Sequence, residues 1–251
     1  MNDRQPTLEQ VARWLDQSHR AVVFTGAGIS TESGIPDFRS PGGVWARNQP
    51  VYFDQFMASA EQRYEYWRQK SEGHNDMAAA EPNVGHEALS RWEATGRLRG
   101  VITQNIDGLH QLADSRQVLE LHGTARQVMC MDCGVRQEAE PLVLQFRRTN
   151  TVPPCDRCGG RMKHATISFG QPLPADVLAE AARWCGEAEL MLAVGSSLVV
   201  TPAADLPREA KHAGARLVIV NRDPTPLDSL ADAVINESIG PTLTEIDAYL
   251  G

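Results

Sequence analysis

Short apolar segments alternate with amphipathic segments along most of the chain. Residues 21–25 read AVVFT, the nearly continuous apolar pattern of a strand buried on both faces of a parallel sheet. Similar short strands are predicted at residues 101–103, 118–121, 190–194 and 217–220. A capping box formed by Thr7 and Gln10 predicts a first helix that ends near His19, and further helices are predicted at residues 174–185 and 202–213. This alternation predicts an α/β fold with a doubly wound parallel sheet.

Two stretches interrupt the alternation, and we interpret both as insertions between strands of the sheet. Residues 41–98 begin with a segment rich in proline and glycine and continue as polar and aromatic helical sequence, whereas residues 124–165 contain two pairs of cysteines. The predicted division is a sheet domain of residues 1–40, 99–123 and 166–251, a helical module of residues 41–98, and a cysteine-containing module of residues 124–165.

The paired cysteines have the spacing of a metal site. Cys130 and Cys133 form one Cys-x-x-Cys pair and Cys155 and Cys158 form another, each followed by a glycine. Four thiolates from two such pairs suit tetrahedral Zn²⁺ and leave no open coordination position, so we expect a structural zinc. The alternative is a pair of redox-active dithiols. Cys185 lies on an apolar helix pattern, and we expect it in the core.

Composition and charge narrow the class of protein. The chain has 251 residues, of which 42% are hydrophobic and 22% charged, a balance that excludes a disordered chain. The formal net charge of −8 disfavours a nucleic-acid partner and suits a basic partner such as a lysine-bearing peptide. The N-terminal residues lack a signal-peptide pattern and the apolar runs are too short for a membrane span, so we expect a cytoplasmic protein, most simply a monomer, without a membrane partner.

A glycine loop follows the first predicted strand. Gly26, Ala27 and Gly28 precede a helix start, where small residues and free N–H groups can bind a pyrophosphate. The alternative is a tight strand–helix turn. Thr31 occupies the position of the third glycine of the dehydrogenase fingerprint, and no acidic residue follows at the end of a second strand. An ordinary hydride-transferring Rossmann domain is therefore disfavoured.

Polar residues follow two other predicted strands, at the edge of the sheet where α/β proteins bind ligands. Asn105 and Asp107 follow one strand, with a polar loop containing Asx turns as the alternative interpretation. His122 follows another strand and could act as a base near neutral pH, with a structural histidine as the alternative. The segment from Asp37 to Arg39 could close over a nucleotide or could contain only a local ion pair.

Together these motifs resemble those of the sirtuins, the NAD-dependent protein-lysine deacylases. The glycine loop with Ser30, the 34–39 segment, residues 103–107, His122, both cysteine pairs, Phe169-Gly170, Gly195-Ser196-Ser197 and Asn221 occur in that family's order. The resemblance covers residues 20–240, nearly the whole chain. It implies a Rossmann-like domain and a small domain composed of a zinc ribbon and a helical module, with NAD and an acyl-lysine substrate in the cleft between them.

The resemblance also implies roles for individual residues. His122 would be the general base, and Asn105 would act with Gln104 on the nicotinamide ribose. Phe38, Ile106 and Asp107 would surround nicotinamide, while Asp37 and Arg39 belong to the loop that closes over the cofactor. The remaining NAD contacts would come from Gly26, Ala27, Gly28, Ser30, Thr31, Gly195, Ser196, Ser197 and Asn221. Ile167, Phe169 and Gly170 would bind the substrate.

The implied reaction joins the acyl oxygen of the lysine amide to C1′ of the ribose as nicotinamide leaves. His122 then activates a ribose hydroxyl, and the products are nicotinamide, lysine and O-acyl-ADP-ribose. A mono-ADP-ribosyltransferase or an NAD glycohydrolase would share the first step, and a non-enzymatic NAD sensor is a third class.

The chain departs from the family pattern in the predicted peptide-binding segment. Residues 163–171 read KHATISFGQ, where many sirtuins have an Arg-Pro start and a final glutamate. Gln171 in place of that carboxylate should weaken any preference for basic peptides. The Tyr-x-x-Arg pair of relatives that prefer acidic acyl groups is absent after Tyr64 and after Tyr66. We therefore expect neutral acyl groups, acetyl first and longer apolar chains after it. The alternative is that Arg63 or Arg68 reaches the site from another register.

Overall fold

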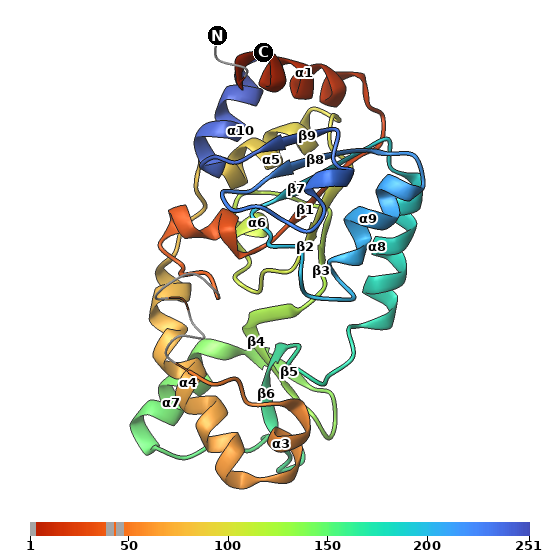
Figure 1. Ribbon diagram of the computed structural model, residues 1–251. Helices are drawn as coiled ribbons and strands as arrows, with labels where there is room; N and C mark the ends of the chain where they lie inside the picture. Colours follow the sequence, from red (N-terminus) through yellow and green to blue (C-terminus); the bar gives the residue numbers. More distant parts are fainter. Residues whose placement is uncertain (1–3, 39–42, 44–47) are drawn as a thin grey trace.

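The computed structural model describes residues 4–38, 43 and 48–251, and Arg39 therefore lies outside the described residues. Figure 1 shows a large α/β part that carries both ends of the chain, and a smaller part below it. The chain crosses between the two parts several times, so the elements of the small part come from separate stretches of the sequence.

The large part is built on a six-stranded sheet in which every strand pair is parallel. Its strands are β1 (Ala21–Thr25), β2 (Gly100–Thr103), β3 (Val118–Glu120), β7 (Leu190–Val194), β8 (Arg216–Val220) and β9 (Ala233–Ile235). The spatial order β3-β2-β1-β7-β8-β9 is that of the Rossmann fold, whose strand order reverses next to the first strand. The predicted fold class is confirmed, and β9 is the strand that the apolar pattern did not predict.

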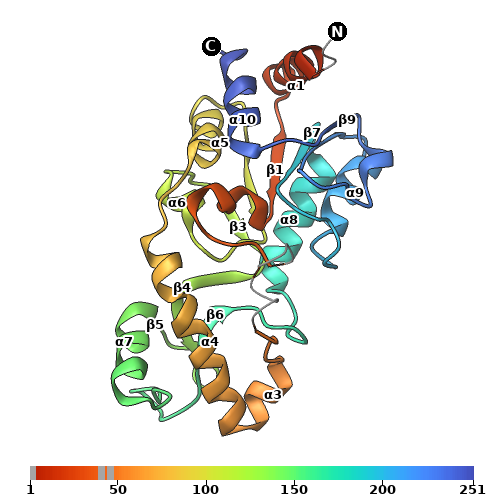
Figure 2. The same cartoon turned by 60° about the vertical axis from the view of Figure 1, so that its left-hand side comes forward.

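Alternate residues of the central strands enter two different cores. In β1, Ala21 and Val23 face the helices α1 (Arg4–Gln17), α5 (Val84–Ala94) and α10 (Ile239–Ala248). Val22 and Phe24 face α8 (Ala175–Glu187) and α9 (Asp205–His212). Figure 2 shows the two helical layers on opposite sides of the sheet. Burial on both faces explains why these strands are almost uninterrupted runs of apolar residues.

Two helices differ from their predicted description. Helix α1 begins at Arg4, so Thr7 lies inside the helix and does not start it. Helix α5 buries Ala88, Leu89 and Trp92 in the core beneath the large sheet and packs along α10. We therefore propose that the helical module ends before α5 and not at residue 98. The reason is that the apolar residues of α5 pack in the core shared with α10, and not in the core of the small part.

The small part has a three-stranded antiparallel sheet of order β5-β4-β6. Its elements are α3 (Phe53–Ala58), α4 (Ala60–Ala79), β4 (Gly123–Cys130), β5 (Arg136–Glu138), α7 (Ala139–Thr149) and β6 (Met162–Thr166). Trp67 of α4 is fully buried against Phe146 of α7, and its indole N–H donates to the Met162 carbonyl at 2.8 Å. The helical and cysteine-containing modules therefore share one core.

Three glycines bring two loops of the large sheet into direct backbone contact. The loop after β1 contains Gly26 and Gly28, the short helix η1 (Ala27–Ser33) begins there, and Gly195 follows β7. The Gly28 N–H donates to the Gly195 carbonyl at 2.8 Å. A Cβ on Gly28 would lie 2.7 Å from the Gly195 Cα, so no side chain fits between the loops. The contact lies where the strand order reverses, the position at which open α/β sheets bind ligands.

Gly195→Ala tests this contact, with Gly34→Ala as the matched control. Both glycines have positive φ, +65° and +83°, which costs a residue with a Cβ about 1–3 kcal/mol. Only Gly195 is also crowded, since its Cβ would lie 2.4 Å from the Ile29 nitrogen, whereas nothing lies within 4 Å of a Cβ on Gly34. We expect Gly195→Ala to lower the free energy of unfolding by a further 1–3 kcal/mol or so, measured by denaturant titration. Equal destabilisation of the two variants would contradict the backbone contact.

Candidate active site

A cavity of about 940 Å³ lies between the carboxyl edge of the large sheet and the small part. The two glycine loops line one end, α4 and residues 166–171 line the other, and His122 lies on its wall. Most residues singled out from the sequence line this cavity: Gly26, Ala27, Gly28, Thr31, Asp37, Phe38, Gln104, Asn105, Ile106, His122, Ile167, Phe169, Gly170, Gly195, Ser196, Ser197 and Asn221. The topology thus brings together side chains from six separate segments of the sequence.

Ser30 and Asp107 are the exceptions, because they lie behind the cavity wall and hold Asn105. The Ser30 hydroxyl donates to Asp107 Oδ2 at 2.8 Å, and it accepts from Asn105 Nδ2 at 3.0 Å. Asn105 Nδ2 also donates to the Gly26 carbonyl at 3.1 Å. Both amide hydrogens of Asn105 are therefore engaged, and its Oδ1 is the atom left to accept a hydrogen bond from a ligand.

Asp107 accepts two hydrogen bonds from within the protein. Besides the Ser30 hydroxyl, the Leu109 N–H donates to its Oδ1 at 2.9 Å, which fixes the start of the short helix α6 (Leu109–Leu112). Asp107 is 4% exposed and Asn105 is 6% exposed. A turn formed by an aspartate was the alternative interpretation of this segment, and the structure contains such a turn together with the inward-facing Asn105.

His122 lies between β3 and β4, with its ring on the cavity wall. Its Nδ1 lies 2.9 Å from the Gln104 carbonyl oxygen. Because a carbonyl can only accept, Nδ1 carries the hydrogen, and Nε2 of the neutral ring is an unprotonated base. Burial lowers the pKa of His122 below its usual value, and the hydrogen bond to Gln104 acts in the opposite sense. The ring is therefore mostly neutral at pH 7.

The glycine after His122 has a clear structural purpose. Gly123 has φ +67°, and a Cβ there would lie 2.0 Å from the Ala165 carbonyl oxygen. The missing side chain lets β4 approach β6 closely, where Gly123 pairs with Thr166. The next residue of that segment, Ile167, donates its N–H to the His122 carbonyl at 2.9 Å. The predicted substrate segment is therefore hydrogen-bonded directly to the backbone of the candidate base.

Several residues that line the cavity were not predicted from the sequence as site residues. Glu237, Ser238 and Ile239 line the cavity just after β9, and Tyr66 and Lys70 line it from α4. A strand-end position could have indicated the first three, but the three-residue strand β9 was too short to be recognised. Tyr66 and Lys70 lie four positions apart on one face of a helix, and the sequence alone does not show which face meets the cavity.

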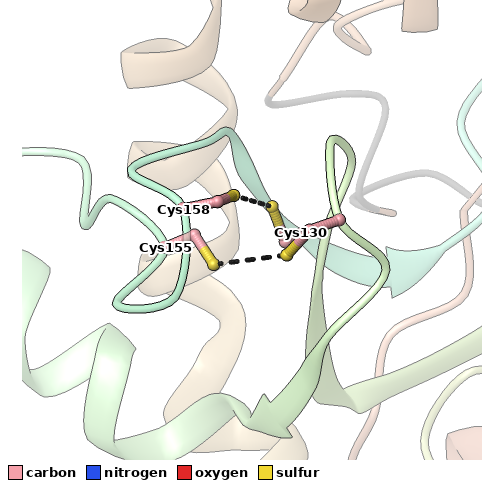
Figure 3. A group of neighbouring side chains, drawn as sticks. Cys130, Cys155 and Cys158 are labelled. Carbon is pink, nitrogen blue, oxygen red and sulfur yellow. Dashed lines mark hydrogen bonds between the residues drawn. The ribbon is translucent and has the colours of Figure 1, made fainter.

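The four paired cysteines meet at one point of the small part. Figure 3 shows Cys130, beside the turn that follows β4, facing Cys155 and Cys158 on a second loop. All four sulfur atoms, that of Cys133 included, lie within 4.8 Å of one another. The Sγ–Sγ distance is 3.6 Å between Cys130 and Cys158 and 3.7 Å between Cys133 and Cys155. A tetrahedral zinc with Zn–S bonds of about 2.3 Å requires Sγ–Sγ distances near 3.8 Å, so the donor set fits Zn²⁺.

The loops that carry these cysteines have the turns expected of zinc knuckles. Gly134 and Gly159 each have positive φ and donate their N–H groups to the carbonyls of Cys130 and Cys155. Asp132 joins the two loops, since it accepts from the Arg161 backbone N–H at 2.7 Å. Cys185 lies apart from the cluster, buried in the core against α9 as expected.

Comparison with known proteins gives a consistent result. The family model of the Sir2 family matches residues 26–202. An "NAD-dependent protein deacetylase" of Rhodopseudomonas palustris is 47% identical over 238 residues, which cover 94% of each chain. Another from Thermodesulfovibrio yellowstonii is 40% identical, covering 92% of this chain and 91% of the relative.

Solved structures agree over nearly the full length. Sir2 with a p53 peptide and NAD⁺ superposes with a TM-score of 0.88 at 38% identity, covering 95% of this chain and 96% of that one. Sir2 bound to an acetylated peptide superposes with a TM-score of 0.87 at 36% identity, covering 97% and 99%. With the Rossmann strand order, the four-cysteine cluster and the His122 cavity in place, this chain belongs to the Sir2 family.

Proposed function

We propose that this chain is an NAD-dependent protein-lysine deacetylase. One observation carries the proposal: His122 lies on the wall of a single cavity that has glycine loops at one end and the Ile167–Gly170 segment at the other. The named relatives are protein deacetylases that use NAD, and the superposed structures hold a peptide with NAD⁺ or an acetylated peptide. The substrates are accordingly NAD and an acyl-lysine side chain of a protein or peptide.

The glycine end of the cavity suits the pyrophosphate and the ribose next to it. Small residues let the phosphates approach the backbone, and the start of η1 offers N–H groups. Gln104 donates from Nε2 to Ser196 Oγ at 2.7 Å, which ties the β2 loop to the β7 loop beside this end. Asn105 would accept from a hydroxyl of the nicotinamide ribose through its free Oδ1, and Phe38 and Ile106 would enclose the nicotinamide ring.

The peptide end suits an extended substrate. Phe169 is 38% exposed and packs against Tyr52 with ring centroids 5.8 Å apart and ring planes tilted by 35°. Its carbonyl accepts from the Phe53 N–H. Gln171 accepts from the Ser168 N–H at 3.2 Å and so holds the turn that contains Gly170. An acyl-lysine side chain inserted between these residues would pass Ile167 and reach the His122 face of the cavity.

The reaction requires that the two substrates are held in a fixed geometry and that one side chain acts as a base. The acyl oxygen forms a bond to C1′ of the ribose while the bond to nicotinamide breaks, and the enclosed cavity keeps water from competing. His122 Nε2 then removes a proton from a ribose hydroxyl, which adds to the acyl carbon. Addition of water and release of the amine give lysine and O-acyl-ADP-ribose.

The four cysteines belong to the same proposal as a structural zinc site. Four protein ligands leave no open position for a substrate. The cluster also lies at the far end of β4 from His122, at Cys130 and not at Gly123. Zinc would therefore stabilise the small part and take no part in the reaction.

The cytoplasmic location and the monomeric state expected from the sequence also remain proposals. No helix in the described part of the chain is long and apolar enough to span a membrane. All five cysteines are free of disulfide bonds, which suits a reducing compartment.

Mass spectrometry of the products tests the proposed reaction. With NAD and an acetyl-lysine peptide we expect nicotinamide, free lysine peptide and O-acetyl-ADP-ribose. His122→Ala should lose about 10²–10⁴-fold in deacetylation, the usual contribution of a general base, but retain exchange of labelled nicotinamide. Free ADP-ribose as the main product would instead indicate a glycohydrolase, and a mass gain of ADP-ribose on protein would indicate a transferase.

A panel of acyl peptides tests the preference for neutral acyl groups. The guanidinium of Arg63 donates to the Phe56 and Met57 carbonyls, and that of Arg68 pairs with Glu65 and Glu72. Neither arginine lines the cavity, so neither is available to a carboxylate on the acyl group. We expect a higher kcat/KM for acetyl-lysine than for succinyl-lysine peptides. A preference for succinyl-lysine would contradict this and would implicate Lys70, the cation on that wall, whose pKa burial lowers to about 8.

Cys130→Ala tests the zinc site, with Cys185→Ala as the control. We expect the first variant to lose its zinc and the small part to become sensitive to proteolysis, because structural zinc contributes on the order of 10 kcal/mol to the folding of small modules. Cys185→Ala should retain one zinc per chain by elemental analysis. A zinc-free Cys130→Ala protein with full activity and wild-type protease resistance would overturn the structural assignment.

A further inference from the structure

One peptide group, between Gln104 and Asn105, is held by hydrogen bonds on both of its sides. Its carbonyl accepts from His122 Nδ1 at 2.9 Å, and its N–H donates to Thr103 Oγ1 at 3.0 Å. The same carbonyl determines which nitrogen of His122 carries the hydrogen. The orientation of this peptide therefore controls whether Nε2, the atom proposed to act as base, is free on the cavity side.

Two further buried side chains stand behind Thr103. The Thr25 hydroxyl donates to Thr103 Oγ1 at 2.8 Å, and His110 Nε2 lies 2.9 Å from Thr25 Oγ1. Because the single hydroxyl hydrogen of Thr25 is used on Thr103, His110 Nε2 must be the donor of the second bond. Burial lowers the pKa of His110 to about 3, with His86 acting in the same sense, so the ring is neutral and can hold this one tautomer.

The fold places these residues together without involving the cavity. Thr25 and Thr103 are the last residues of β1 and β2 and are direct partners in the parallel ladder, and His110 is on α6. They are 0%, 2% and 1% exposed, and none of the three lines the cavity. Buried polar side chains lower stability unless they are hydrogen-bonded. Three such side chains, hydrogen-bonded in series and ending on the peptide beside His122, therefore indicate a functional role.

We propose that Thr103, supported by Thr25 and His110, is a positioning residue for His122. The path of hydrogen bonds runs from His110 through Thr25 and Thr103 to the Gln104–Asn105 peptide, and from there to His122. A hydrogen bond donated by a peptide N–H strengthens the bond that its carbonyl accepts, because the two polarise the same group. Thr103 thus acts on the ring orientation and the tautomer of His122 without touching substrate.

Thr103→Val tests the proposal, because valine keeps the shape of threonine but leaves the Asn105 N–H without its acceptor. The Gln104 carbonyl raises the pKa of His122, so a loosened peptide should lower that pKa. The base works when neutral, and the acid limb of the deacetylation pH profile should therefore move to lower pH. Deacetylation should fall about tenfold as the ring loses its fixed orientation, while nicotinamide exchange, which needs no base, should change much less.

A second readout is independent of catalysis. Nitrogen NMR of the histidine rings reports the tautomer and the pKa of His122 directly, and Thr103→Val should populate the Nε2–H tautomer that is absent when the carbonyl is held. Thr103→Ser restores the hydroxyl and should restore both the tautomer and the pH profile. Thr25→Val removes the bonds to Thr103 and from His110 but leaves the bond between Thr103 and the Asn105 N–H. It should therefore shift both readouts in the same direction by a smaller amount, which covers the case that Thr103→Val does not fold.

Thr242→Val is a control for the loss of a buried threonine hydroxyl, since Thr242 is also fully buried and donates to the Ser238 carbonyl, but lies on α10 away from this path. A wild-type tautomer and pH profile in both Thr103→Val and Thr25→Val would overturn the proposal. So would an equal loss of exchange and deacetylation without a pH shift, because that pattern indicates a general structural defect. The proposal takes the role of His122 from the proposed function, but the NMR result separates the two: a tautomer change in a protein without deacetylase activity would leave the positioning intact and refute only the function.

Discussion

The backbone contact between the loops after β1 and β7 is the constraint on which the rest of the site depends. Gly28 and Gly195 touch without side chains between them, at the point where the strand order reverses. This contact forms one end of the cavity and fixes the start of η1. Ser30 of η1 in turn holds Asn105 and Asp107 by hydrogen bonds. Larger residues at either glycine would separate the loops and remove the surface that suits a pyrophosphate.

The second constraint joins the two parts of the molecule at His122. The side chain of His122 is held by the large sheet through the Gln104 carbonyl, whereas its own carbonyl is bonded to the Ile167 N–H beside β6 of the small part. One residue therefore lies in the hydrogen-bond networks of both parts. A base in this position can act on a dinucleotide bound by one part and a peptide bound by the other, which explains why the cavity spans the two.

Five of the six strands of the large sheet and the cysteine cluster could be predicted because each leaves a local signal, an apolar run or a fixed spacing. The sequence could not show that α5 packs on α10, since an apolar stripe does not identify its partner. It also could not separate residues that line the cavity from those behind it. The resemblance implies cofactor contacts for Ser30 and Asp107, and in the structure both lie beneath Asn105, where Ser30 accepts from the Asn105 amide and donates to Asp107. Directions of hydrogen bonds depend on tertiary contacts, so the sequence could not show that Thr25, Thr103 and His110 are connected, although Thr103 belongs to the 103–107 motif.

A crystal structure of this chain with ADP-ribose and an acetyl-lysine peptide is the most direct test of the account. The account predicts the pyrophosphate against the Gly26–Gly28 backbone and the acetyl-lysine between Ile167 and Phe169, with its acyl group beside the ribose. It also predicts His122 Nε2 within hydrogen-bond distance of a ribose hydroxyl and Nδ1 still on the Gln104 carbonyl. ADP-ribose bound away from the glycine loops, or an acetyl group directed away from His122, would contradict it.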